Sequence, residues 1–181
     1  MIVEQCMSKS PRCCTPGDTL STAARILWEQ DLGALPVVDH AGALVGMITD
    51  RDLCMAAYTS GLPLHASTVG RHMSKTVFSI GAKADAAKVV ELMKARQVRR
   101  VPVVENGKLV GLVTLSDLAR TAGKNGKLKG LAFDAVVDAL CSVSAARAAS
   151  PAVSASVPAP LPKARKVKAV IPKPRTLAKR R

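Results

Sequence analysis

The sequence contains one pattern twice, and this internal repeat constrains the fold more than any other feature of the chain. Shifting the sequence by 66 residues aligns Met7-Ser8-Lys9 with Met73-Ser74-Lys75 and the Pro-Val-Val at 36–38 with the Pro-Val-Val at 102–104. Self-similarity at a fixed spacing is typical of folds in which equivalent units stack and bury a continuous core. The copies together fill residues 7 to about 122. A unit of roughly 50 residues could hardly bury its apolar faces alone, so we expect the two units to pack together.

Each copy predicts the same local order of a helix, a hairpin and a second helix. Asn106-Gly107, between two apolar runs, suits the positive φ angles of a tight hairpin turn. In the first copy Asp18 stands at the expected N-cap of the first helix, and Gly33 follows that helix as a stop signal. Apolar spacing predicts helices over 19–30, 50–59, 85–96 and 115–122, hairpin strands over 35–38, 44–48, 101–104 and 109–113, and an extended lead-in over 76–80.

The composition restricts what the core can contain. Hydrophobic residues make up 48% of the 181 residues, whereas aromatic residues make up only 2%. A core must therefore be built from Val, Leu, Ile, Ala and Met, which favours compact α/β packing of small side chains.

A short motif recurs where the second hairpin strand of each copy meets the following helix. In "GMITDRD" and "GLVTLSD" a threonine ends the strand and an aspartate follows three residues later, within the first helical turn. This spacing brings a hydroxyl and a carboxylate to a helix N-terminus, where free N–H groups and the helix dipole favour an anion such as phosphate. The same spacing is close to a capping box, in which both side chains serve the helix alone. From spacing alone the cap is the preferred interpretation.

The order of these elements, with Pro-Val-Val in the hairpin and Leu-Val-Gly-x-(Ile/Val)-Thr-x-x-Asp-Leu after it, resembles the cystathionine-β-synthase (CBS) domain. Two copies in tandem resemble a CBS pair, or Bateman module. The resemblance implies an α/β (α+β) fold of two β-α-β-β-α repeats packed as a pseudo-two-fold pair. We assign repeat 1 to residues 1–62 and repeat 2 to residues 66–122.

The resemblance also implies a ligand. In nucleotide-binding CBS pairs the matching threonine contacts phosphate and the matching aspartate contacts ribose. We therefore expect an adenosine nucleotide (AMP, ADP or ATP) as a regulatory ligand in the cleft between the repeats, with no cofactor required. Other CBS pairs bind nothing detectable and act as packing or dimerisation modules, which is the alternative. The residues that match the ligand pattern are Thr49, Asp52, Thr114 and Asp117.

Basic residues distinguish the two expected sites. The family often places a basic side chain just before Pro-Val-Val, close to the phosphates; the second copy has Arg99 and Arg100 there, and the first has Gly33 and Ala34. The two clefts should therefore differ in charge and bind one ligand unequally. Further candidates are Arg51 and Lys75 for polyphosphate and Val77 for the adenine.

The C-terminal part of the chain has a different composition. Residues 123–130 read as a polar linker, residues 131–149 as a further helix, and residues 150–181 as a disordered Ala/Pro/Lys-rich tail resembling those of linker histones. The formal net charge is +14, and the tail holds nine basic residues and no acid. These basic residues are Lys163, Arg165, Lys166, Lys168, Lys173, Arg175, Lys179, Arg180 and Arg181.

Such a tail can bind nucleic acid by releasing counterions from the phosphates. This gives an alternative function, a DNA- or RNA-binding protein without sequence specificity in which the CBS pair is a dimeric scaffold. A solvated tail that only improves solubility is the other interpretation. The leading hypothesis is a regulatory module that acts as a homodimer and passes its ligand state to a partner, such as a separately encoded enzyme or transporter, or through its basic tail.

Several classes of function are disfavoured. The chain shows no nucleophile paired with a base, no P-loop and no Gly-x-Gly-x-x-Gly, so we expect no catalytic residues. The five cysteines lack Cys-x-x-Cys spacing and the histidines are scattered, so we expect no metal site. Vicinal Cys13 and Cys14 form either a redox pair or two ordinary thiols, and we favour the thiols. Without a long apolar run we expect no membrane insertion and a cytoplasmic protein, associated with the nucleoid if the tail binds DNA.

Overall fold

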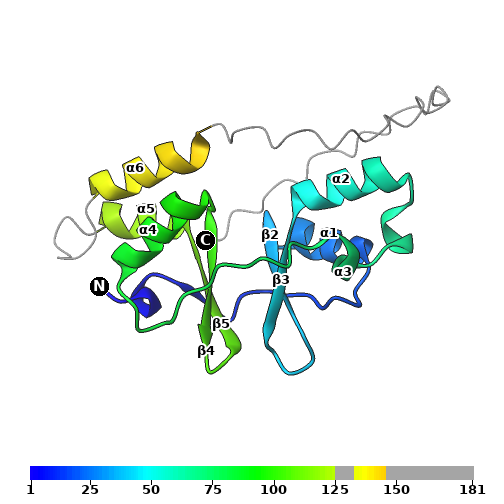
Figure 1. Cartoon of the computed structure of the whole chain (residues 1–181), viewed down its shortest axis with the longest axis horizontal. Coiled ribbons are helices and arrows are strands. Elements are labelled where there is room, and N and C mark those ends of the chain that lie inside the picture. Colours follow the sequence, from blue (N-terminus) through cyan, green and yellow to red (C-terminus); the bar gives the residue numbers. More distant parts are fainter. Residues whose placement is uncertain (125–132, 146–181) are drawn as a thin grey trace, which may run out of the picture. The chain divides into compact units, whose positions relative to one another are not determined.

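The computed structural model describes residues 1–124 and 133–145. It has the mixed α/β architecture that the sequence predicts, with helices packed against small antiparallel sheets (Figure 1). Most of the expected linker and the whole basic tail, with its nine cationic side chains, lie outside the described residues. The nucleic-acid hypothesis therefore stays a prediction from the sequence.

The first repeat is built around one antiparallel hairpin, whose strands are rich in Val, Leu and Ile. Its second strand runs directly into a helix, because Thr49 keeps extended dihedral angles and caps the next residues. The elements are α1 (Leu20–Glu29), β2 (Ala34–Val38), β3 (Leu44–Thr49) and α2 (Asp50–Ser60), followed by the short helices η2 (Leu64–Ala66) and α3 (Val69–His72).

The second repeat has the same order and the same register. Ala34 pairs with Thr49 in the first hairpin and Arg100 pairs with Thr114 in the second, and both hairpins change register at the second valine of Pro-Val-Val. Asn106 and Gly107 have φ angles of 48° and 77°, as expected for the tight turn. The elements are α4 (Ala86–Arg96), β4 (Arg100–Glu105), β5 (Lys108–Thr114) and α5 (Leu115–Lys124).

The ends of α1 differ from the sequence prediction. The N-cap is Thr19, whose side chain accepts a hydrogen bond from the Thr22 N–H, while Asp18 instead accepts from Thr15. The left-handed residue after the helix is Asp31, with a φ of 52°, and not Gly33. Asp18 and Thr19 are both good caps, so position alone could not choose between them.

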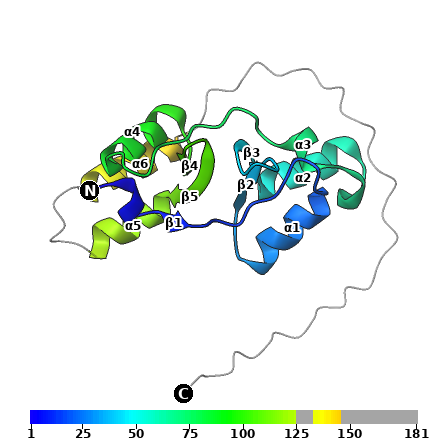
Figure 2. The same cartoon turned by 90° about the horizontal axis from the view of Figure 1, so that it is seen from below.

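The N-terminal segment of the chain crosses to the second repeat. The 3₁₀ turn η1 (Val3–Gln5) lies in the second-repeat core, and β1 (Ser8–Lys9) adds a third strand to β5 (Figure 2). Conversely, Ser74, near the start of the second repeat, pairs with Met47 of β3. The equivalent segments around Ser8 and Ser74 thus each pair with the hairpin of the other repeat, and this exchange joins the two repeats. The predicted lead-in over 76–80 instead reaches its own repeat, where Ile80 bridges Val103.

Two glycines make this exchange possible. A Cβ added to Gly111 would lie 2.4 Å from the Met7 Sδ, and one added to Gly46 would lie 2.6 Å from the Met73 Sδ. Each thioether therefore packs closely on strand backbone, and a residue larger than glycine would require the methionine side chain to shift. This explains physically why both copies contain Leu-Val-Gly and a methionine at the aligned positions.

Each repeat has a core of its own. The first-repeat core is built from the β2–β3 hairpin and helices α1 to α3, and includes the buried residues Leu20, Leu35 and Ile48. The second-repeat core includes Met93 and Leu118 and is extended by a further helix, α6 (Phe133–Ser144), which lies in the range predicted to be helical. The assigned boundaries at residues 62 and 66 stay a prediction.

Within residues 1–124 and 133–145, every helix falls short of the length and apolar content that a membrane span requires.

Candidate functional site

Both Thr-x-x-Asp motifs form a capping box. The Thr49 N–H and hydroxyl donate to Asp52 Oδ2 at 2.8 and 2.7 Å, and the Asp52 N–H donates to Thr49 Oγ1 at 3.2 Å. The Thr114–Asp117 pair repeats these contacts at 2.9, 2.7 and 3.1 Å. The capping prediction is therefore confirmed in both copies. The box uses only one carboxylate oxygen, so Oδ1 of each aspartate remains as a second acceptor.

The two corners differ at that second oxygen. Asp117 Oδ1 forms an ion pair with Arg120, whose side chain is 67% exposed while that of Asp117 is only 8% exposed. Asp52 Oδ1 has no hydrogen-bond partner among residues 1–124 and 133–145. The aligned position in the first repeat is Met55, which carries no charge. The sequence analysis did not consider Arg120, although its i, i+3 spacing from Asp117 on a helix was a usable signal.

The first helical turn also differs between the corners. In α2 the Asp50 carboxylate accepts from the Arg51 N–H at 2.7 Å, so an acidic side chain occupies the anion-binding position. In α5 the aligned residue is Leu115, and the Ser116 N–H has no hydrogen-bond partner in the described part of the chain. The Thr49 corner thus carries an acidic side chain at the first helical turn that the Thr114 corner lacks, which favours an anion at the Thr114 corner.

The Thr114 corner opens into a groove of about 850 Å³. It is lined by residues of the N-terminal segment, of the loop between α1 and β2, of the start of β4, of the end of β5, of α5 and of α6. Four predicted site residues, Thr114, Asp117, Arg99 and Arg100, meet here. The other predicted site residues, Thr49, Arg51, Asp52, Lys75 and Val77, do not line this groove.

Positive charge gathers along the polar part of the groove. Arg99 and Arg100 are joined there by Arg12 and Arg120. The sequence analysis missed Arg12, because only the crossing of the N-terminal segment brings it to the second repeat. Asp31 and Asp117 also line the groove, but the four guanidinium groups outnumber these carboxylates and suit a ligand with one or more phosphate groups.

Arg100 explains why residue 33 is a glycine. A Cβ on Gly33 would lie 2.5 Å from Arg100 Nη2 and 3.7 Å from Asp50 Oδ2. The guanidinium of the second repeat therefore lies against the backbone of the first, at the start of β2. Since Ala34 and Arg100 occupy equivalent strand positions, only one of the two corners has such an arginine.

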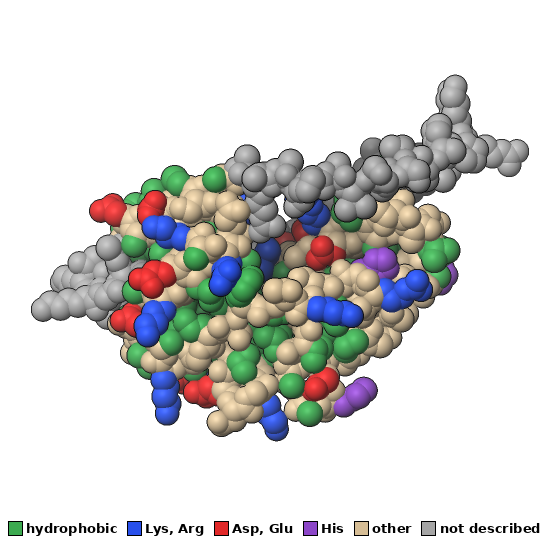
Figure 3. Space-filling view, in the orientation of Figure 1, with side chains coloured by type: hydrophobic (Ala, Val, Ile, Leu, Met, Phe, Trp, Pro, Cys, Tyr) green, Lys and Arg blue, Asp and Glu red, His purple; other side chains and the backbone are tan. Residues whose placement is uncertain are grey.

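The remaining wall of the groove is apolar and comes from α6. Val136, Ala139 and Val143 on one side of this helix are buried in the second-repeat core, whereas Phe133, Val137 and Leu140 are exposed toward the groove. An ion pair between Lys94 and Asp138 and a 3.3 Å bond from the Gln97 Nε2 to the Ser142 carbonyl join α6 to α4. Figure 3 shows acidic and basic side chains alternating along the edge formed by α4 and α6.

The family of the chain follows from this geometry and from comparison with known proteins. A family model for the CBS domain matches residues 3–58 and 68–124. The chain belongs to the CBS domain family. The two repeats of the structure are thus a tandem CBS pair, to which α6 is an addition outside the matched residues.

The relatives include proteins of known structure. Hypoxic response protein 1 of Mycobacterium tuberculosis is 36% identical over 114 residues, which cover 63% of this chain and 80% of that protein. The crystal structure of hypoxic response protein I with two coordinated zinc ions superimposes with a TM-score of 0.61 at 34% identity, covering 66% of this chain and 98% of the other.

Two further structures contain adenosine ligands. The CBS pair of protein MJ0100, in complex with 5-methylthioadenosine and S-adenosyl-L-methionine, gives a TM-score of 0.62 at 29% identity and covers 68% of this chain and 97% of that one. CBSX2 in complex with AMP gives a TM-score of 0.61 at 25% identity and covers 68% and 96%.

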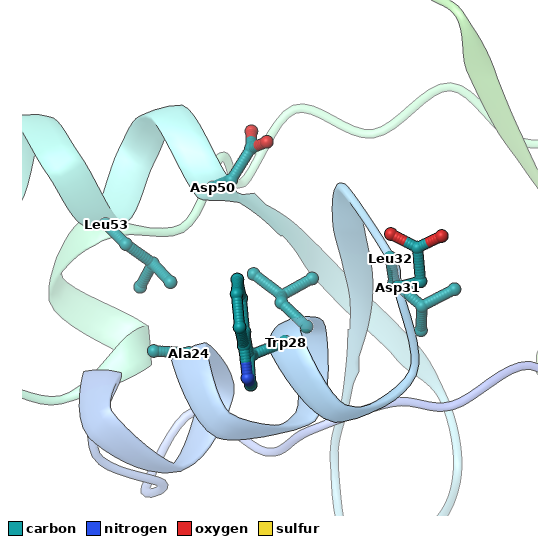
Figure 4. A pocket seen from close by; sticks show the side chains of 7 residues that line it. Ala24, Trp28, Asp31, Leu32, Asp50 and Leu53 are labelled. Atoms are coloured by element: carbon teal, nitrogen blue, oxygen red, sulfur yellow. The ribbon is translucent and has the colours of Figure 1, made fainter. Parts of the chain in front are cut away.

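A second hollow lies on the first CBS repeat, between α1 and α2 (Figure 4). It has a volume of about 550 Å³ and is lined mainly by apolar side chains, with Asp31 and Asp50 among them. Trp28 stands in it and is 88% exposed. In the second CBS repeat, α6 packs on the corresponding pair of helices, α4 and α5.

The other predicted ligand residues lie apart. Arg51 and Lys75 are exposed, and Val77 is half-buried. Phe78, the aromatic residue next to Val77, has the Arg96 guanidinium 4.7 Å from its ring centre, so one face of the ring is already covered. A role of these residues in binding stays a prediction.

Cysteine and metal chemistry find little support in the described residues. Within residues 1–124 and 133–145, no group of three or more His, Cys, Asp or Glu side chains could hold a metal ion. Cys13 is exposed and Cys14 is buried. Burial, followed by the charges of Asp18 and Cys13, raises the pKa of the Cys14 thiol to about 12. A thiol so reluctant to ionise is a poor redox nucleophile, which supports the interpretation as two ordinary thiols.

Proposed function

We propose that this chain is a non-enzymatic regulatory module that binds an adenosine nucleotide (AMP, ADP or ATP) in the groove beside Thr114 and Asp117. The observation that carries the proposal is that four arginines line the same groove as the first turn of α5, where the Ser116 N–H is unpartnered within the described residues. Phosphate would lie against this turn, and the ribose hydroxyls would reach the Asp117 carboxylate.

The Thr49 corner is the weaker of the two proposed sites for a phosphorylated ligand. Asp50 places a carboxylate at the first turn of α2, and Gly33 and Ala34 replace the two arginines. Like charges near a phosphate cost affinity, whereas guanidinium groups add charge-assisted hydrogen bonds. AMP should therefore prefer the groove beside Thr114 and Asp117, called the second-repeat groove below.

The similar structures support adenosine as the common element of the ligand. MJ0100 is in complex with 5-methylthioadenosine and S-adenosyl-L-methionine, and CBSX2 is in complex with AMP. Both ligand types share the adenosine group and differ in charge. The arginines of this groove favour the phosphorylated type.

Thermal unfolding in the presence of AMP, ATP, S-adenosylmethionine and GTP tests the proposal. At an AMP concentration of about 100 times the dissociation constant, binding stabilises the folded state by about 2.7 kcal/mol, which is measurable as a rise in Tm. The Arg100→Ala variant should lose most of this rise, whereas Arg71→Ala, an exposed arginine outside the groove, should keep it. Unchanged melting curves with every ligand would contradict nucleotide binding.

The partners of the module are expected from the sequence alone. A homodimer, a separately encoded enzyme or transporter that responds to the ligand, and DNA or RNA bound by the tail all stay predictions. Removing residues 151–181 separates the last of these from the nucleotide function. If the tail binds DNA, retardation of DNA should vanish while the thermal response to AMP survives; retained DNA binding would count against the tail.

A further inference from the structure

The second-repeat groove contains an ion pair that the first repeat lacks. Arg120 occupies Oδ1 of Asp117, while the capping box already uses Oδ2. Both oxygens of this carboxylate are therefore engaged by groups of the protein itself. At the aligned position of the first repeat stands Met55, and Asp52 Oδ1 has no partner among the residues described.

This arrangement creates competition for one acceptor. Oδ2 already accepts two bonds from Thr114, so a ribose hydroxyl that donates to Asp117 shares Oδ1 with Arg120 and competes with it for that side of the carboxylate. The Arg120 side chain is 67% exposed, and ion pairs so close to solvent are weak. Displacing Arg120 should therefore lower the affinity of a ligand by no more than about fivefold.

If the ligand is anionic, the displaced Arg120 side chain can gain a new partner within the groove. Arg120 lines the same groove as Arg12, Arg99 and Arg100, and its long side chain can swing from the carboxylate to a phosphate nearby. A guanidinium that pairs with phosphate forms charge-assisted, often bidentate hydrogen bonds. An uncharged nucleoside has no phosphate. It must therefore compete with Arg120 for Asp117 without offering Arg120 another partner.

We infer that Arg120 is a specificity-determining residue, which makes the second-repeat groove select phosphorylated nucleosides over uncharged ones by exchanging its Asp117 partner for a ligand phosphate. This inference rests on the proposed function of the groove. It adds a residue outside the Thr-x-x-Asp motif, and it names the chemical feature of the ligand that the residue recognises.

Calorimetric titration of the full chain with AMP and with adenosine tests the inference. In Arg120→Met, which copies Met55 of the first repeat, AMP affinity should fall at least tenfold, while adenosine affinity should stay unchanged or rise up to fivefold. Arg120→Lys should keep part of the preference. The matched control is Arg25→Met, because Arg25 is also an exposed helical arginine, paired with Glu29 at 3.6 Å, but lies outside the groove. It should bind both ligands like the wild type.

The outcomes separate the two proposals. An unchanged ratio of AMP to adenosine affinity in Arg120→Met overturns the role of Arg120 and leaves nucleotide binding intact. An equal loss for both ligands also overturns it, because it indicates that Arg120 only holds Asp117 in place. Wild-type protein that binds neither ligand overturns the proposed function, and the inference with it.

Discussion

The two CBS repeats share their backbone design and differ in what surrounds it. Both have the same hairpin register and an equivalent capping box, and in both a methionine at the aligned position packs on a strand glycine. The Thr49 corner nevertheless carries Asp50 and a free carboxylate oxygen, while the Thr114 corner carries arginines and an ion pair. The repeated motif therefore builds the corner, and residues outside the motif give the two corners different charge.

The helix faces of the repeats differ as well. Helix α6 covers α4 and α5 with Val136, Ala139 and Val143, whereas α1 and α2 leave Trp28 exposed. Among the described residues, a further helix therefore covers the second repeat and not the first. The following predictions test how far this asymmetry extends.

The largest effect on stability is expected where α6 covers α4 and α5. Val136→Asp places an unpaired carboxylate where the side chain is buried, and it should lower the free energy of unfolding by more than about 3 kcal/mol in urea titrations. The matched control is Val137→Asp on the exposed side of the same helix, which should cost far less. Trp28→Ser, on the open face of the first repeat, should stay within about 0.5 kcal/mol. A cost at Trp28 as large as that at Val136 would contradict an open face.

The two buried glycines should respond unequally. Gly46→Ala brings a methyl group against the Met73 side chain and within 3.1 Å of the Ser74 carbonyl oxygen, whereas Gly111→Ala meets only the flexible Met7 side chain. Overpacking of this kind costs about 1 to 3 kcal/mol, and Gly46→Ala should lie at the upper end because backbone cannot move aside. Urea unfolding of the two variants measures the difference. A greater loss of unfolding free energy in Gly111→Ala than in Gly46→Ala would contradict this prediction.

The capping aspartates should also differ. Asp52→Ala and Asp117→Ala each remove a cap worth about 0.5 to 2 kcal/mol. Asp117→Ala should cost more, because Asp117 is buried and also loses the Arg120 pair. Unfolding of the ligand-free variants measures this order. Equal costs would indicate that the Arg120 pair contributes nothing to folding.

The smallest effect concerns a core thiol and appears only at alkaline pH. The folded-state pKa of Cys14, about 12, lies above the reference value of 9.0, so folding favours the neutral thiol. The stability that this preference contributes is complete below pH 9 and is lost as the pH rises toward 12. Between pH 8 and about pH 10 the wild type should lose about 1 kcal/mol through this thiol, and Cys14→Ala should not. Cys13→Ala, at the exposed neighbour, is the control. Parallel pH profiles for wild type and Cys14→Ala would contradict the assignment.

Much of the fold could be predicted from local sequence. Asn106-Gly107 gave the turn, and the Thr-x-x-Asp spacing gave both helix starts, because these features depend on neighbouring residues. The crossing of residues 1–9 to the second repeat could not be predicted in this way, since it depends on pairing between β1 and β5, which lie far apart in the chain.

The candidate site likewise contains residues that local sequence predicts and residues that only tertiary packing brings in. Thr114, Asp117, Arg99 and Arg100 were found from the motif and its flanks. Arg12 and the apolar wall of α6 come to the groove only through tertiary packing, so no local pattern pointed to them. Residues near the motif were predictable, and those that complete the groove from elsewhere were not.

Calorimetric titration of AMP into Thr49→Val and Thr114→Val tests the central claim most directly, because each variant loses the same cap hydroxyl and controls for the other. The account predicts that Thr114→Val loses at least tenfold in affinity, while Thr49→Val binds AMP nearly as the wild type does. Loss of binding in Thr49→Val, with Thr114→Val unaffected, would contradict it.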